Sequence, residues 1–210
     1  MRYESGSCAV CNKKIRSGTL CNPCEGKNLN NIFINYYYSD KTLKGLLTHI
    51  KHYYVQEALD ILIKITCDAL EKAAAHQPAL RISMEDPEQV TLVPVPLHKN
   101  RLRERGFNQS QLLAEGLARY FGWTVNGCLK KIKNTAAQTL LPRRKRLENV
   151  KDAFVLEKDH DLTGRHVIIV DDVVTTGSTL TACAAVLETA KPISISAIVV
   201  AKNHDSSSKK

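Results

Sequence analysis

Apolar positions along this chain form short runs, and helical patterns occupy the segments between them. The run at residues 167–170 contains only β-branched residues, which is typical of a parallel strand buried on both faces. β-branched and aromatic residues predict another strand over residues 32–38, and a third is expected over residues 89–95. The polar stretch at residues 76–88 contains two prolines and is expected to be a surface loop. The pattern predicts an α/β fold with a parallel sheet flanked by helices.

Helices are predicted where apolar residues recur at helical spacing. Ser39 or Asp40 can cap a helix that places four apolar residues on one face: Leu43, Leu46, Leu47 and Ile50. A second helix is expected over residues 55–75, and a third begins near Asn108. These helices would cover the faces of the predicted sheet.

Two aspartates and a hydroxyl-rich turn follow the buried run. The turn combines Gly177, which permits close approach of the backbone, with the hydroxyls of Thr175, Thr176, Ser178 and Thr179. A helical pattern follows, so the turn lies at a helix N-terminus and can cradle a phosphate. Asp171 and Asp172 would repel that phosphate and need hydroxyls or a divalent cation, which a ribose phosphate with Mg²⁺ supplies together. An ordinary capped turn is the alternative, but it leaves the paired aspartates unexplained.

A cationic segment follows the strand expected over residues 89–95. It is predicted to be a proline-stiffened loop that carries Lys99, Arg101, Arg103 and Arg105. Guanidinium groups at a strand end suit an anion such as pyrophosphate. Such a charge run is more often a solvated face, and its place after a strand is what favours a site.

A second cationic segment covers residues 130–154 and has few apolar residues in its middle. We expect it to be mobile, and a loop that closes over an anion such as pyrophosphate would stabilise its charge and exclude water. Arg143 and Arg146 are the candidate lid residues. A basic linker, or a strip that binds a nucleic-acid backbone, explains the same composition.

Four of the seven cysteines form two pairs, each with two residues between its members: Cys8, Cys11, Cys21 and Cys24. This spacing predicts a structural Zn²⁺ site with four thiolate ligands, which leaves no coordination position for a substrate. Iron in the same site and a pair of disulfides are the alternatives. Cys67, Cys128 and Cys183 lie in apolar or helical contexts and are expected to be buried.

Composition limits the function classes further. The 210 residues carry 30 Lys and Arg against 21 Asp and Glu, and the formal net charge of +9 favours polyanionic partners. The chain starts without an apolar leader pattern and has no run long enough to span a bilayer. We therefore expect a soluble cytoplasmic protein without membrane insertion.

The segment at residues 167–179 resembles the phosphoribosyl pyrophosphate (PRPP) signature of type I phosphoribosyltransferases. The order of the other motifs sharpens the resemblance: paired cysteines, a Tyr-rich strand, the proline and arginine segment at residues 94–110, and then residues 146–154. Together they resemble the ComF family of competence-associated proteins over nearly the whole chain. The resemblance implies that Asp171 and Asp172 contact the ribose hydroxyls, while residues 174–179, Val174 to Thr179, wrap the 5′-phosphate.

The paired cysteines predict a zinc knuckle at residues 1–30, and the resemblance implies a type I phosphoribosyltransferase-like domain at residues 31–202. The polar tail at residues 203–210 is expected to be disordered. The leading hypothesis is transfer of a phosphoribosyl group from Mg²⁺-bound PRPP to an unknown nitrogen acceptor, linked to DNA uptake. Arg101 and Arg105 would then stabilise the pyrophosphate. The zinc knuckle and the segment through Tyr38 would have to cover the acceptor.

A second hypothesis is a non-catalytic accessory or scaffold protein that handles single-stranded nucleic acid and retains the same fold. The resemblance adds a DNA-translocating ATPase as a possible partner. Aromatic rings near the basic segments could stack on bases. The candidates are Phe107, Tyr120, Phe121 and Trp123. A third hypothesis makes the zinc knuckle a docking module for a protein partner.

Overall fold

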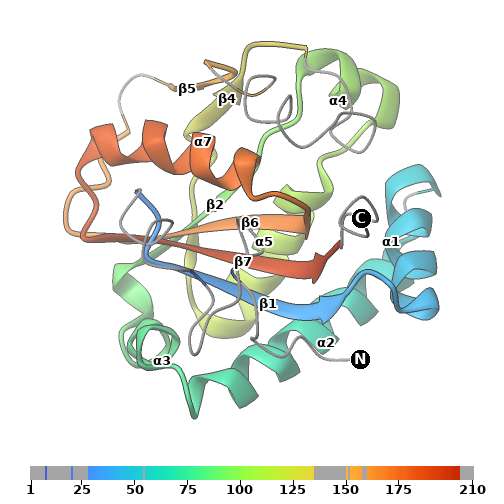
Figure 1. Ribbon diagram of the computed structural model, residues 1–210, viewed down its shortest axis with the longest axis horizontal. Helices are drawn as coiled ribbons and strands as arrows, with labels where there is room; N and C mark the ends of the chain where they lie inside the picture. The colour runs from blue at the N-terminus through green and yellow to red at the C-terminus, as the bar shows by residue number, and fades with distance from the viewer. Residues whose placement is uncertain are drawn as a thin grey trace, which may run out of the picture.

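The computed structural model describes residues 28–53, 55–134, 152–157 and 160–203, together with Cys8, Leu20 and Val150. A five-stranded sheet in the order β1-β7-β6-β2-β3 crosses the molecule, and all neighbouring strands are parallel (Figure 1). Its strands are β1 (Asn31–Tyr37), β2 (Val90–Pro94), β3 (Thr124–Val125), β6 (His166–Val174) and β7 (Ser194–Lys202). A separate antiparallel pair consists of β4 (Leu129–Lys131) and β5 (Phe154–Leu156). The predicted α/β fold is confirmed.

Helices cover both faces of the sheet. They are α1 (Lys41–Tyr53), α2 (Gln56–Ala74), α3 (Pro78–Glu85), α4 (Lys99–Arg105), α5 (Gln109–Phe121) and α7 (Ser178–Leu187), with short 3₁₀ turns at Pro87–Gln89 and Glu188–Ala190. In Figure 1, α7 lies above the sheet and α2 below it. The described part of the chain is thus a three-layer arrangement.

The centre of the sheet is buried on both faces, as the β-branched run predicts. Val167 and Ile169 pack in the core on the α7 side, whereas Ile168 and Val170 pack in the core that contains α1, α2 and α5. Alternate side chains of a strand point to opposite faces, so one run of residues serves both cores. β6 can therefore hold its carboxyl end rigidly at the edge of the sheet.

Two predictions about local structure are wrong. The expected surface loop at residues 76–88 contains α3, because Leu80 is buried in the core and Trp123 Nε1 donates a hydrogen bond to the carbonyl of Ser83 (2.9 Å). The expected cationic loop forms helix α4, which begins after His98 and ends at Gly106 in the left-handed conformation (φ 81°). Tertiary packing and end capping outweigh the polar composition in these two segments.

Cys8 is buried against the last strand. Its carbonyl accepts a hydrogen bond from Nζ of the fully buried Lys202 (3.0 Å), which ties the N-terminal part of the chain to β7. Cys11, Cys21 and Cys24 lie outside the described residues, so the zinc site stays a prediction. Three other thiols are buried as expected: Cys67, Cys128 and Cys183.

None of the helices in the described residues combines the length and apolar character that a bilayer crossing requires.

Candidate functional site

A cavity of about 340 Å³ opens at the carboxyl edge of the parallel sheet. Residues that follow β1 and β2, the end of β6 and Asn203 after β7 all line it. Open parallel sheets bind ligands at this edge, because the loops there are free to form a crevice. Its charged and polar lining residues are Tyr38, Lys51, His98, Arg101, Arg105, Gln109, Lys131, Asn134, Asp171, Asp172, Thr175, Thr179 and Asn203.

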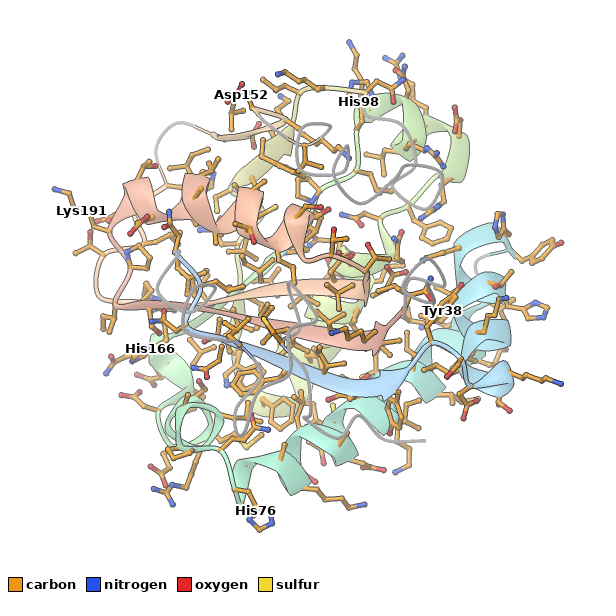
Figure 2. All side chains as sticks on the ribbon, in the orientation of Figure 1. Tyr38, His76, His98, Asp152, His166 and Lys191 are labelled. Carbon is orange, nitrogen blue, oxygen red and sulfur yellow. The ribbon has the colours of Figure 1, made fainter. Side chains whose placement is uncertain are left out.

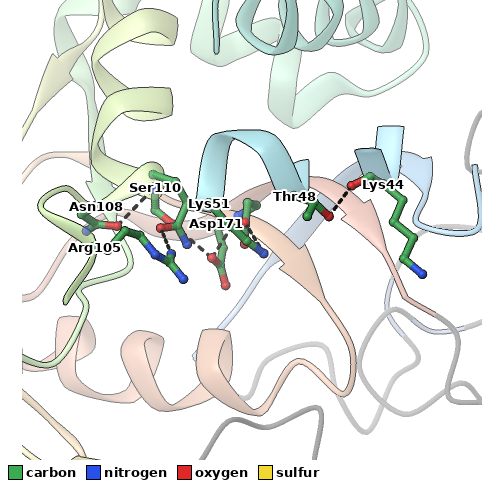
Figure 3. Close-up of polar contacts among 9 residues, drawn as sticks. Lys44, Thr48, Lys51, Arg105, Asn108, Ser110 and Asp171 are labelled. Carbon is green, nitrogen blue, oxygen red and sulfur yellow. Dashed lines mark hydrogen bonds and ion pairs between the residues drawn. The ribbon is translucent and has the colours of Figure 1, made fainter. Parts of the chain in front are cut away.

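Asp171 and Asp172 lie in the last part of β6 and have different partners. Asp171 Oδ1 accepts hydrogen bonds from Ser110 Oγ (3.2 Å) and from the backbone N–H of Asp172 (2.9 Å). Asp172 is 5% exposed, and its Oδ2 lies 2.6 Å from Nζ of Lys51 (Figure 3). This contact is an ion pair by distance, and within the described residues that oxygen receives no hydrogen bond of regular geometry. Opposite charges attract at any angle, so the two groups form an ion pair at this distance.

The electrostatics of the pair favour a proton on one carboxyl group. Burial, and then the charge of Asp172, raise the pKa of Asp171 from 3.8 to about 7, although hydrogen bonds and Lys51 oppose the shift. Strong pKa shifts of this kind cluster at functional sites. Burial of two adjacent carboxyl groups lowers the stability of the fold, and packing of the core does not need them. A ligand that supplies hydroxyl donors or a cation would relieve the repulsion between the two carboxyl groups.

Lys51 was missed by the sequence analysis. It belongs to the last turn of α1 and reaches the carboxyl end of β6, far along the chain. Burial lowers the pKa of Lys51, but the charges of Asp172 and Asp171 outweigh this, so the net pKa is raised. Lys51 follows the buried Leu43 and Leu47 by eight and four residues, so it lies on the buried face of α1. A lysine at an apolar position of the helical pattern is the local signal that could have identified it.

Two of the predicted cations reach the cavity from α4. Arg105 is half-buried and Arg101 is exposed, and both line the cavity. Lys99 and Arg103 are exposed and do not line it. Arg105 Nη1 donates to Gln109 Oε1, which fixes the guanidinium at the start of α5 (Figure 3). Burial lowers the pKa of Arg105 and the charge of Asp172 opposes that effect. The helix thus sorts the cations at residues 99–105 into two facing the cavity and two facing solvent.

The start of α5 supports both the arginine and the aspartate side of the cavity. Asn108 caps the helix by accepting from the backbone N–H of Ser110 (3.1 Å) and donates Nδ2–H to the carbonyl of Val95 (3.0 Å). The cap positions Ser110 under Asp171 and Gln109 beside Arg105. The motif at residues 107–110 therefore organises the site.

The hydroxyl-rich turn divides its side chains between two roles. Thr175 and Thr179 line the cavity, whereas Thr176 and Ser178 are buried with their hydroxyl oxygens 3.0 Å apart. Gly177 has φ 69°, a left-handed conformation in which a side chain would be strained, and α7 begins at the next residue. The first turn of α7 therefore lies beside the cavity, where its N–H groups suit an anion.

The remaining candidate residues lie in the core, at the cavity or outside the described residues. The side chain of Val174 is buried in the core, and its carbonyl accepts from the N–H of Asn203 (2.8 Å). Lys131, at the end of β4, also lines the cavity. Arg143 and Arg146 lie outside the described residues, so their part in a lid stays a prediction.

Most of the proposed stacking residues are occupied elsewhere. Trp123 is 5% exposed and stacks on Phe121 with ring centroids 4.5 Å apart. Tyr120 is exposed, but its hydroxyl donates to Glu71 (2.9 Å). Phe107 is partly buried against the core on the α2 side. These rings do not form a basic stacking surface.

Comparison with known proteins agrees with this geometry. The model of the phosphoribosyl transferase domain matches residues 108–210, which include the start of α5, the aspartate pair and the turn. Competence protein F from Haemophilus influenzae is 32% identical over 197 residues, an alignment that covers 84% of this chain and 82% of that protein. The chain belongs to the ComF family.

Two other relatives match a shorter part of this chain. DNA utilization protein YhgH from Escherichia coli is 45% identical over 98 residues, which cover 46% of this chain and 42% of that protein. Competence protein ComFC from Bacillus subtilis is 34% identical over 114 residues, which cover 53% of this chain and 44% of that protein. The ComF relatives thus link this phosphoribosyltransferase-like fold to proteins named for competence and DNA utilization.

Proposed function

We propose that this chain binds PRPP at the carboxyl edge of the sheet and transfers its phosphoribosyl group to a nitrogen nucleophile. The observation that carries the proposal is the convergence of three chemistries on one cavity: paired carboxylates, two guanidinium groups and a hydroxyl-rich helix start. A ribose with a 5′-phosphate and a 1′-diphosphate needs all three. Neither a simple phosphate nor a free sugar does.

Each part of the site has a role in this proposal. Asp171 and Asp172 accept hydrogen bonds from the ribose hydroxyls, while the turn at residues 175–179 holds the 5′-phosphate. Arg101 and Arg105 bind the diphosphate. The carboxylates also fit Mg²⁺, which prefers oxygen ligands and would offset diphosphate charge when it enters with the substrate.

The reaction would be a substitution at C1′ of the ribose. The nitrogen lone pair forms the new C1′–N bond, the C1′–O bond breaks, and its electron pair leaves with pyrophosphate. The nitrogen then loses its proton to solvent. Arg101 and Arg105 would stabilise the charge that develops on the leaving group, and the cavity would hold both reactants in line.

Calorimetric titration with Mg²⁺ and PRPP tests the binding step. The Asp171→Asn/Asp172→Asn variant should bind at least about 100-fold more weakly, because it loses two charged acceptors. Unchanged affinity in a folded double variant would refute the assignment of the site. If the wild type binds, release of pyrophosphate in the presence of different bases would identify the acceptor.

A second candidate function is binding of single-stranded DNA by the outer face of α1. Apart from Lys51, which faces the cavity, this helix contains two lysines and two histidines but no carboxylate: Lys41, Lys44, His49 and His52. Tyr53 is 71% exposed, and its ring lies 5.7 Å from that of His49 and 6.4 Å from that of His52, measured between centroids. Exposed rings among cations are suited to base stacking along a phosphate backbone.

Fluorescence anisotropy of a labelled oligothymidylate at low and high salt tests this candidate. Tyr53→Ala should weaken binding about fivefold, because one stacking platform is lost. Tyr120→Ala is the matched control, since Tyr120 is also exposed but pairs with Glu71. Absence of binding at low salt would rule out this candidate function. Any contact with DNA would then have to come through a partner such as a DNA-translocating ATPase.

A further inference from the structure

Lys51 occupies a position that the proposed ligand needs. Its Nζ lies 2.6 Å from Asp172 Oδ2, and the two side chains are 24% and 8% exposed. Both residues line the cavity. Figure 3 shows Lys51 beside Asp171, whereas Lys44 on the same helix extends away. The ion pair therefore lies within the cavity, mostly shielded from water.

Asp171 and Asp172 differ in the kind of donor they face. Asp171 receives neutral donors, the hydroxyl of Ser110 and a backbone N–H, which leave its second oxygen for a ligand. Asp172 faces an ammonium group. Burial lowers the pKa of Lys51, but the charges of Asp172 and Asp171 outweigh burial and raise the pKa above its usual value. The ammonium is therefore charged at neutral pH.

A ribose hydroxyl and an ammonium group compete for the same oxygen. Both are hydrogen-bond donors, and Oδ2 of Asp172 is buried, so a hydroxyl reaches it only if Nζ of Lys51 withdraws. The withdrawn ammonium would stay in a partly dehydrated cavity that already contains Arg101, Arg105 and Lys131. A buried cation without a counter-ion is costly, and three neighbouring cations increase that cost.

The charge of the ligand decides whether the displaced ammonium finds an anion to pair with. A neutral riboside supplies hydroxyls only, so the displaced ammonium would have no anion. A ribose that also carries phosphate or diphosphate supplies an anion within the same cavity. The exchange of Lys51 from Asp172 to that anion then keeps both charges paired.

We propose that Lys51 is a specificity-determining residue that admits a ribose diol only when the same molecule carries a phosphate or diphosphate. This inference rests on the proposed PRPP site. It assigns the selectivity against neutral nucleosides and sugars to an ion pair outside the PRPP signature. The residue acts through its exchange of partners, and it takes no part in bond breaking.

The test compares two probes on the wild type and on Lys51→Met. PRPP with Mg²⁺ is measured by calorimetry, and neutral methyl β-D-ribofuranoside is measured by NMR titration. Lys51→Met should bind PRPP about tenfold more weakly, because one charge-assisted contact is lost. Its affinity for the riboside should stay equal or rise, since no ion pair has to be broken. Selectivity for PRPP over the riboside should therefore fall about tenfold or more.

Three controls separate this role from a structural one. Lys72→Met removes an exposed lysine from the last turn of α2, outside the cavity and outside α1, and should change neither affinity. Lys51→Arg should retain most of the selectivity. If Lys51→Met does not fold, Lys51→Gln, which keeps a neutral donor to Asp172, should show the same loss of selectivity.

Two outcomes would overturn the inference in distinguishable ways. Equal losses for both probes in Lys51→Met or Lys51→Gln would show that Lys51 only holds the cavity in shape. Failure of the folded wild type to bind PRPP would instead refute the proposed function, and the inference with it.

Discussion

The two edges of the parallel sheet carry polar side chains in opposite situations. At the amino edge, Arg165 donates from Nε to Thr91 Oγ1 (2.9 Å) and from Nη2 to Thr124 Oγ1 (2.9 Å). There too, His166 Nδ1 lies 2.8 Å from Ser194 Oγ. These groups pair with each other across β2, β3, β6 and β7, as in a structural clamp.

At the carboxyl edge the charged groups face a cavity instead. Asp171 and Asp172 lie side by side, which no structural clamp requires, and Arg101 and Arg105 approach from α4. Figure 2 shows Tyr38 and His166 toward opposite ends of the central strands, one near each edge of the sheet. The comparison teaches that polarity alone does not mark a site. A site is marked by charges whose best partner is a ligand.

The arginines of the carboxyl edge give the sharpest version of this contrast. Arg101→Ala/Arg105→Ala should weaken PRPP binding about 100-fold, because two guanidinium contacts to the diphosphate are lost. The free energy of unfolding should change little, since neither cation supports the core. Calorimetry and urea unfolding measure the two quantities. Arg103→Ala, on the solvent side of α4, is the control, and a similar loss there would reduce the effect to overall charge.

Arg165 offers the converse case at the amino edge. Arg165→Ala should lower the free energy of unfolding by about 2 kcal/mol, because Thr91 and Thr124 lose donors in a partly buried network. PRPP affinity should stay within about twofold, since the cavity lies at the other end of the strands. Urea unfolding and calorimetry again provide the readouts. A large loss of affinity would show that the two edges are coupled through β6.

The pH dependence of stability reports on Asp171 itself. Burial and then Asp172 raise its pKa from 3.8 to about 7, so the folded protein holds the proton more tightly than the unfolded chain. The stabilisation is complete below pH 4 and is lost as the pH rises through 7. Relative to Asp171→Asn, the wild type should lose about 1 kcal/mol of unfolding free energy or more between pH 5 and 8. Parallel curves in urea unfolding would contradict the raised pKa.

Much of the fold could be predicted because local and global preferences agree. The β-branched run at residues 167–170 has one stable place, the middle of a parallel sheet. Helices α1 and α5 begin where Asp40 and Asn108 provide caps, and both side chains accept the expected backbone hydrogen bonds. The turn at residues 175–179 combines a strand end, a left-handed glycine and a helix start, all of which have local signatures.

The features that were missed depend on contacts between distant segments. Helix α3 is stabilised by burial of Leu80 and by the bond from Trp123 to Ser83, neither of which its own polar sequence reveals. The pairing of Lys51 with Asp172 joins α1 to β6 across the sheet. Sequence patterns report periodicity along one element and carry no record of such encounters.

The order of the strands affects how the chain folds during its synthesis. During synthesis β1 leaves the ribosome first, yet its partner in the sheet is β7, the last strand to emerge. Until β7 pairs with β1 and β6, the nascent chain exposes two apolar strand edges. The hydrogen bond from Lys202 to Cys8 is also absent until then. A ribosome that stalls before residue 194 would therefore release an incomplete sheet prone to aggregation, however well its earlier helices had formed.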